Sequence, residues 1–85
     1  MKTNKNTKEF ELSFNFRSVL YIAQVTTWSQ LNDNYFAIDY FSPNEKGKIY
    51  LLSTSDNNGA QWQELANTHD KEFIKEIINQ LQNKI

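Results

Sequence analysis

The strongest constraint on this chain is the helical spacing of apolar side chains in its last segment, from about residue 68 to residue 85. Between them lie mostly charged and amide side chains, and no Gly or Pro follows Gly59. Residues at this period make one apolar face of an amphipathic helix. Thr68 is the predicted N-cap, because a hydroxyl can accept a backbone N–H in the first turn. The stripe cannot remain in water, so the rest of the chain must cover it. It comprises Phe73, Ile74, Ile77, Ile78, Leu81 and Ile85.

The segment from Phe10 to Phe16 has a different period. Apolar residues alternate there with polar ones, which places every aromatic or leucine side chain on one face of a strand. Val19 to Trp28 is rich in β-branched and aromatic residues, which also favour a strand. Between them, Arg17-Ser18 lacks the Asn-Gly or Asp-Gly pair of a strong hairpin turn. The sequence therefore allows either a hairpin at this point or one long bent strand.

Further turn signals divide the middle of the chain. Asn and Asp in residues 31–34 indicate a loop, and residues 35–41 alternate as a strand. Pro43 and Gly47 then predict a turn over residues 42–47 that joins this strand to another at 48–53. Asn58-Gly59 is typical of a type I′ turn. The segment 60–65 after it fits either a last strand or a helical turn.

These elements predict an α+β fold. Short connections favour an antiparallel β-meander of about four or five strands in chain order, with the C-terminal amphipathic helix packed on one face. Residues 1–8 are polar after Met1 and are predicted to form a flexible tail, and 9–85 a single α+β domain, as suits a chain of 85 residues.

Catalytic chemistry has little support in the residue pattern. The chain has no cysteine, which excludes thiol catalysis and thiolate metal sites, and its two glycines cannot form a phosphate-binding loop. His69 is the only histidine and is predicted to lie exposed in the first turn of the helix. Asp39 interrupts an aromatic strand, and alternation predicts that it faces solvent. We therefore expect no enzyme, no catalytic residue, no metal site and no cofactor.

The sequence also predicts a cytoplasmic protein without membrane contact. No apolar run approaches the ~20 residues that span a bilayer. The polar N-terminus lacks the apolar segment of a signal peptide.

Aromatic residues are more numerous than one helix can cover. The face predicted to lie under the helix carries Phe10, Leu12, Phe14, Phe16, Tyr21, Phe36, Ile38, Ile49 and Leu51. The opposite face would then carry Tyr35, Phe41, Tyr50 and Leu52, with Trp28 or Trp62 beside them. A sheet covered on one side is normally polar on the other. The second apolar face therefore indicates either an interaction surface or a sheet so curled that both faces contribute to the core.

The functional prediction follows from that second face. A small non-enzymatic protein-interaction module would bind a protein partner or a second copy of itself through the helix-free face, with a homodimer as one form. The alternative is binding of single-stranded nucleic acid, whose bases stack on aromatic side chains. An acidic body weighs against this alternative, because the sheet segment supplies only Arg17, Lys46 and Lys48 as cations.

Overall fold

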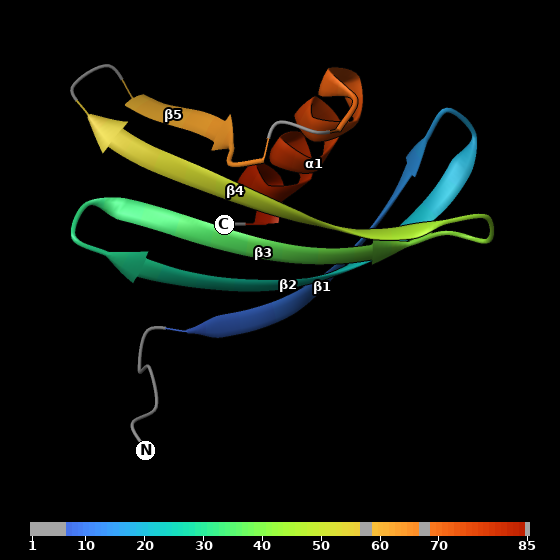
Figure 1. Cartoon of the computed structure of the whole chain (residues 1–85), viewed down its shortest axis with the longest axis horizontal. Helices are drawn as coiled ribbons and strands as arrows, with labels where there is room; N and C mark the ends of the chain where they lie inside the picture. Colours follow the sequence, from blue (N-terminus) through green and yellow to red (C-terminus); the bar gives the residue numbers. More distant parts are fainter. Residues whose placement is uncertain (1–6, 57–58, 67–68, 85) are drawn as a thin grey trace.

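The computed structural model of the chain describes residues 7–56, 59–66 and 69–84. Five strands form one antiparallel sheet in the order β1-β2-β3-β4-β5, and one helix follows. This confirms the predicted α+β meander. Figure 1 shows the strands in chain order with the helix on one side of the sheet. The elements are β1 (Lys8–Phe16), β2 (Val19–Gln30), β3 (Asp33–Phe41), β4 (Lys46–Asp56), β5 (Gly59–Glu64) and α1 (Lys71–Lys84).

The β1–β2 connection is a tight hairpin. Arg17 and Ser18 both have positive φ, at 53° and 68°. Two consecutive left-handed residues are the backbone of a type I′ turn, whose twist matches that of the flanking strands. The alternative of one long bent strand is therefore wrong. β1 itself begins at Lys8, the last residue of the predicted tail, and residues 1–6 lie outside the described part of the chain.

The other turns confirm three connections and refine their details. β2 and β3 are joined at residues 31–32, and the positive φ of 56° falls on Leu31 rather than on an Asn or Asp. In the β3–β4 turn, the backbone N–H of Ser42 donates to the carbonyl of Glu45 at 2.8 Å. β5 is a strand, so the helical-turn alternative for this segment is wrong. Gly59 has φ of 105°, while residues 57–58 are not described.

The helix begins later than the sequence predicted. Its first residue is Lys71, and Asp70 caps it. The Asp70 carboxylate accepts the backbone N–H of Glu72 at 3.0 Å, and the Asp70 carbonyl accepts that of Ile74 at 3.0 Å. A carboxylate at this position satisfies an end N–H and suits the positive end of the helix dipole. Thr68 itself lies outside the described residues.

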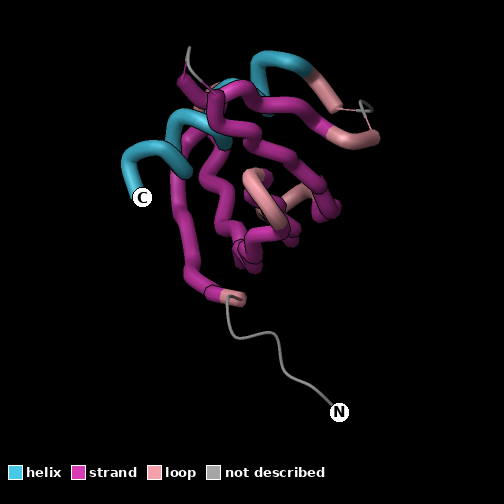
Figure 2. Tube along the Cα trace, turned by 90° about the vertical axis from the view of Figure 1, so that its left-hand side faces the viewer, coloured by secondary structure: helices cyan, strands magenta, loops and turns pink. Residues whose placement is uncertain are grey.

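The core lies between α1 and the face of the sheet that the helix covers, which we call the inner face. Figure 2 shows the sheet twisted and curved, with α1 along one side of it. Phe10 and Phe16, also predicted for this face, pack against the core while remaining partly exposed. The other predicted inner-face residues are all buried. The buried apolar residues are Leu12, Phe14, Tyr21, Ala23, Val25, Phe36, Ile38, Tyr40, Ile49, Leu51, Phe73, Ile74, Ile77 and Leu81.

Candidate functional site

The outer face of the sheet, which points away from α1, carries large apolar side chains in two groups. Alternation along the strands puts them there, because their neighbours in sequence fill the inner face. Phe41 and Leu20 remain 49% exposed and Tyr50 42% exposed. The first group consists of Trp28, Tyr35, Tyr50 and Leu52, with Leu65 just after β5, and the second of Leu20, Ile22, Phe41 and Pro43.

The first group is ordered by contacts across the strands. Trp28 of β2 lies opposite Tyr35 of β3, and Tyr35 lies opposite Leu52 of β4. The Trp28 and Tyr35 rings stack with centroids 5.6 Å apart and an interplanar angle of 14°. Both side chains are therefore half-buried without any contribution from the helix. Curling of the sheet has not drawn this face into the core.

A polar row separates the two apolar groups. The register places Glu11, Gln24, Asp39 and Lys48 side by side across β1 to β4. Asp39 faces solvent, as alternation predicted, and its carboxylate lies 3.4 Å from the Lys48 ammonium. That contact raises the pKa of Lys48 above its usual value. Along this row, the negative charge of Glu11 lies at the β1 side of the face and the positive charge of Lys48 at the β4 side.

Trp62 does not belong to the outer face, so this part of the predicted surface is wrong. β5 pairs with β4 in a register that places Trp62 opposite Ser53, which is buried on the inner face. Its ring lies 5.2 Å from that of Phe36. The indole N–H is buried and has no hydrogen-bond partner among the described residues. The sequence did pair Trp62 with Glu64 on one face, but the assignment of that face needed the β4–β5 register.

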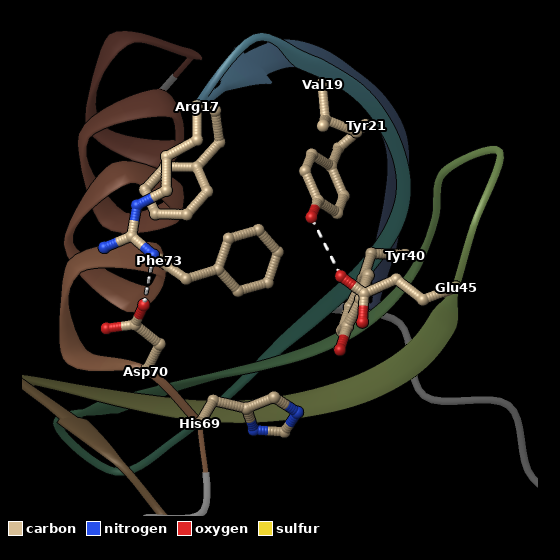
Figure 3. A pocket seen from close by; sticks show the side chains of 9 residues that line it. Arg17, Val19, Tyr21, Tyr40, Glu45, His69, Asp70 and Phe73 are labelled. Atoms are coloured by element: carbon tan, nitrogen blue, oxygen red, sulfur yellow. Dashed lines mark hydrogen bonds and ion pairs between the residues drawn. The ribbon is translucent and has the colours of Figure 1, made fainter.

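A hollow lies on the inner side, at the end of the sheet where β1–β2 curves over the first turn of α1. Figure 3 shows this end pocket with side chains from the β1–β2 turn, the β3–β4 turn and the start of the helix. Its volume is about 420 Å³. The lining residues are Phe16, Arg17, Val19, Tyr21, Tyr40, Glu45, His69, Asp70 and Phe73.

Two tyrosines form the wall of the end pocket nearest the sheet. The Tyr21 hydroxyl donates a hydrogen bond of 2.8 Å to the Glu45 carboxylate (Figure 3). This hydrogen bond, followed by burial, raises the pKa of Tyr21 above its usual value. Burial raises the pKa of Tyr40, and the nearby carboxylates of Glu45 and Glu64 raise it further. Burial and the neighbouring carboxylates together favour the neutral form of both phenols.

His69 also lines the end pocket, which corrects the prediction that it is exposed in the helix. It precedes α1 and is only partly exposed. Its Nδ1 lies 2.7 Å from Oε2 of Glu64, whose side chain is just 6% exposed. The imidazole also meets the Tyr40 ring edge-on at 6.0 Å between centroids. A carboxylate on one ring nitrogen fixes the orientation of the imidazole.

Arg17 and Asp70 close the side of the pocket next to the helix. One Arg17 nitrogen lies 3.1 Å from the Asp70 carboxylate, and the two side chains are 64% and 46% exposed to solvent. The Arg17 guanidinium also lies 4.7 Å from the centre of the Phe16 ring. The contact joins the β1–β2 turn to the N-terminus of α1. The sequence analysis singled out neither residue for a site, because the two are far apart in the chain and only the fold brings them into contact.

Comparison with protein-family models, with curated proteins and with solved structures found no match to this chain. Within residues 7–56, 59–66 and 69–84, no three His, Asp or Glu side chains come close enough together to hold a metal ion. In the same residues, no helix is long and apolar enough to cross a membrane.

Proposed function

We propose that this chain is a non-enzymatic interaction module that associates with a second copy of itself through the outer face of the sheet. The observation that carries the proposal is the two-group apolar surface, with Phe41 and Tyr50 each more than two-fifths exposed. Apolar groups of this extent on a sheet face are typical of association sites. Tyr and Trp are favoured in such sites because they bury a large area and keep a polar atom.

The charge pattern of the outer face fits a second copy. Two sheets packed face to face about a twofold axis parallel to their strands, midway between β2 and β3, bring β1 of one copy over β4 of the other. Glu11 of each copy then meets Lys48 of the other, because the two residues occupy the same row. The same operation sets Ile22 over Phe41 and Trp28 over Tyr35.

The area is also sufficient for a specific contact. Strands of nine residues, as in β1 and β3, are ~30 Å long, and the four strands β1–β4 are ~19 Å wide. The projected area is roughly 600 Å², near the ~800 Å² per partner of an ordinary interface.

The same charges weigh against the nucleic-acid alternative. The lysines of the outer face are Lys46 and Lys48 in the described part of the chain, and Asp39 already pairs with Lys48. Glu9 and Glu11 lie on the β1 side of the same face. A phosphate backbone is bound by clustered Lys and Arg and is repelled by such acids.

Light scattering after size exclusion tests the proposal at roughly 10–100 µM, above the micromolar Kd at the weak end of ordinary interfaces. The expected result is a dimer for the unchanged chain. Glu11→Lys should weaken the dimer about tenfold or more, because it sets lysine against lysine in the assembly. Adding Lys48→Glu to that variant should restore the dimer.

The matched control is Glu76→Lys, which makes the same charge change on α1 and should leave the dimer intact. Circular dichroism of each variant confirms that the fold is retained. A strictly monomeric chain over this concentration range would refute the proposal, and so would a dimer unaffected by Glu11→Lys and by Tyr50→Ser.

A further inference from the structure

The end pocket has an aromatic wall that is suited to a cation. The Phe73 ring lies 4.9 Å from that of Tyr21 and 5.1 Å from that of Tyr40, and the two tyrosine rings are 6.1 Å apart. Figure 3 shows these rings arranged around one hollow, with Glu45 at its edge. The face of an aromatic ring is negative and attracts a cation held within ~6 Å of its centre.

Some charged groups around the pocket have a partner of opposite charge, and Glu45 has none within the described part of the chain. The Asp70 carboxylate lies 3.1 Å from Arg17 and also caps the N-terminus of α1. The Arg17 guanidinium and the positive end of the helix therefore already have a carboxylate as partner. Glu45 accepts a hydrogen bond from the neutral Tyr21 hydroxyl. Among the described residues, no Lys, Arg or His lies within 4.0 Å of the Glu45 carboxylate. The pocket therefore has an excess of negative charge at its mouth, next to the tyrosine rings.

Glu64 adds to this negative surrounding from the inner side. Its carboxylate is nearly buried behind His69, and it contributes with Glu45 to raising the pKa of Tyr40. An anionic ligand would have to enter against Glu45 and Glu64, because Arg17 already lies against Asp70. A cation would gain from the carboxylates and from the rings together.

We propose that the end pocket binds an alkylammonium group, with its cationic head against the Tyr21 and Tyr40 rings and the Glu45 carboxylate as counter-ion. The site lies on the inner side of the sheet and is independent of the outer-face dimer. A pocket of about 420 Å³ accommodates a primary or a methylated ammonium together with part of its alkyl chain.

Nuclear magnetic resonance titration of the full chain tests the proposal. The probes are tetramethylammonium and n-butylammonium, and tert-butanol is the uncharged probe of similar shape to the first. The expected result is saturable shifts at Tyr21, Tyr40 and Phe73 with both ammonium ions and none with tert-butanol. Glu45→Gln keeps the side-chain shape and should weaken binding roughly five- to tenfold.

Glu76→Gln is the matched control, because it removes the same charge from a residue of α1 that does not line the pocket, and it should leave the affinity unchanged. A short peptide with one trimethyllysine is compared with tetramethylammonium. Tighter binding of the peptide assigns the ammonium to a protein side chain, and equal binding assigns it to a free amine.

Three results would overturn the proposal. One is the absence of saturable shifts at millimolar ammonium, and another is equal binding of tert-butanol. The third is an unchanged affinity in a folded Glu45→Gln variant. None of these depends on the oligomeric state, which the outer-face variants report separately.

Discussion

The two faces of this sheet are built from alternate residues of the same strands, yet they end in different environments. On the inner face, Ile38, Ile49 and Leu51 are almost completely buried. On the outer face, Tyr50 and Phe41 remain close to half exposed. Both faces are apolar in sequence, and α1 covers only one of them. Apolar alternation therefore shows which residues share a face, while the position of the helix decides which face becomes the core.

The faces also use their aromatic residues differently. At the end pocket, rings from β1, β2 and β3 surround Phe73 of α1 and fix the helix against the curved end of the sheet. On the outer face, Trp28 and Tyr35 stack on each other, on the side of the sheet that points away from α1. Truncation should accordingly be costly for folding on the inner face and should act mainly on association on the outer face.

The largest expected difference between the two faces is in the stability lost when one of two neighbouring leucines is replaced by alanine. Leu51→Ala removes a fully buried side chain and should lower the free energy of unfolding by about 2–5 kcal/mol. Leu52→Ala makes the same chemical change on the half-buried outer face and should cost about 1 kcal/mol. Urea denaturation at low protein concentration measures both. Equal losses would contradict the assignment of a single covered face.

The next test concerns Gly47, which lies opposite Tyr40 on the inner face. A Cβ placed on Gly47 would come within 2.5 Å of the Tyr40 hydroxyl and 2.7 Å of its Cζ. Tyr40 is buried, so its ring cannot move freely out of the way. Gly47→Ala should therefore cost about 1–3 kcal/mol.

Lys46→Ala on the exposed outer side of the same strand is the control for Gly47→Ala, and it should change stability by less than ~0.5 kcal/mol. Urea denaturation compares the two variants. If Gly47→Ala were as stable as the control, the close packing of Tyr40 over β4 would be wrong.

The smallest expected effect is a change in folding stability with pH. The pKa values of Tyr21 and Tyr40 are raised in the folded chain. Above the usual tyrosine pKa of about 10, the unfolded chain loses these protons first, so the folded state holds more protons. The stability contributed by these tyrosines is thus fully present below pH ~10 and is lost as pH rises through their folded pKa values.

Urea midpoints measured from about pH 9 to pH 11 should therefore fall, and Tyr21→Phe should make the fall shallower because one raised pKa is removed. The Tyr21→Phe variant also loses its hydrogen bond to Glu45, so the comparison is between slopes rather than absolute stabilities. An unchanged slope would argue against the Tyr21–Glu45 contact.

Most of the fold could be predicted because its signals are local. Phe10 to Phe16 alternate, Pro43 and Gly47 mark a turn, and the last segment has a helical period. Thr68 and Asp70 are both good capping residues two positions apart, so the sequence alone did not single out Asp70. In the structure Asp70 caps the helix, and its carboxylate also lies against Arg17.

The candidate sites were less accessible from sequence, because they depend on contacts between distant residues. Alternation within its own strand placed Tyr35 on the outer face, where Trp28 was predicted only as an alternative to Trp62. Trp62 was misplaced, because only the β4–β5 register puts it opposite Ser53. Glu64 was not recognised at all, although its alternation with Trp62 placed both on one face. His69 was expected to be exposed, whereas it lies beside the buried Glu64.

The sequence by itself determined the order and type of the elements, since hydrophobic period and turn residues act over a few positions along the chain. It also determined that more apolar surface exists than one helix can cover. Only the tertiary structure decided which face carries Trp62, that residues 17, 45 and 69 meet around one pocket, and that residue 64 lies against residue 69. Strand register and sheet curvature make those decisions, because they bring together residues whose spacing in sequence has no period.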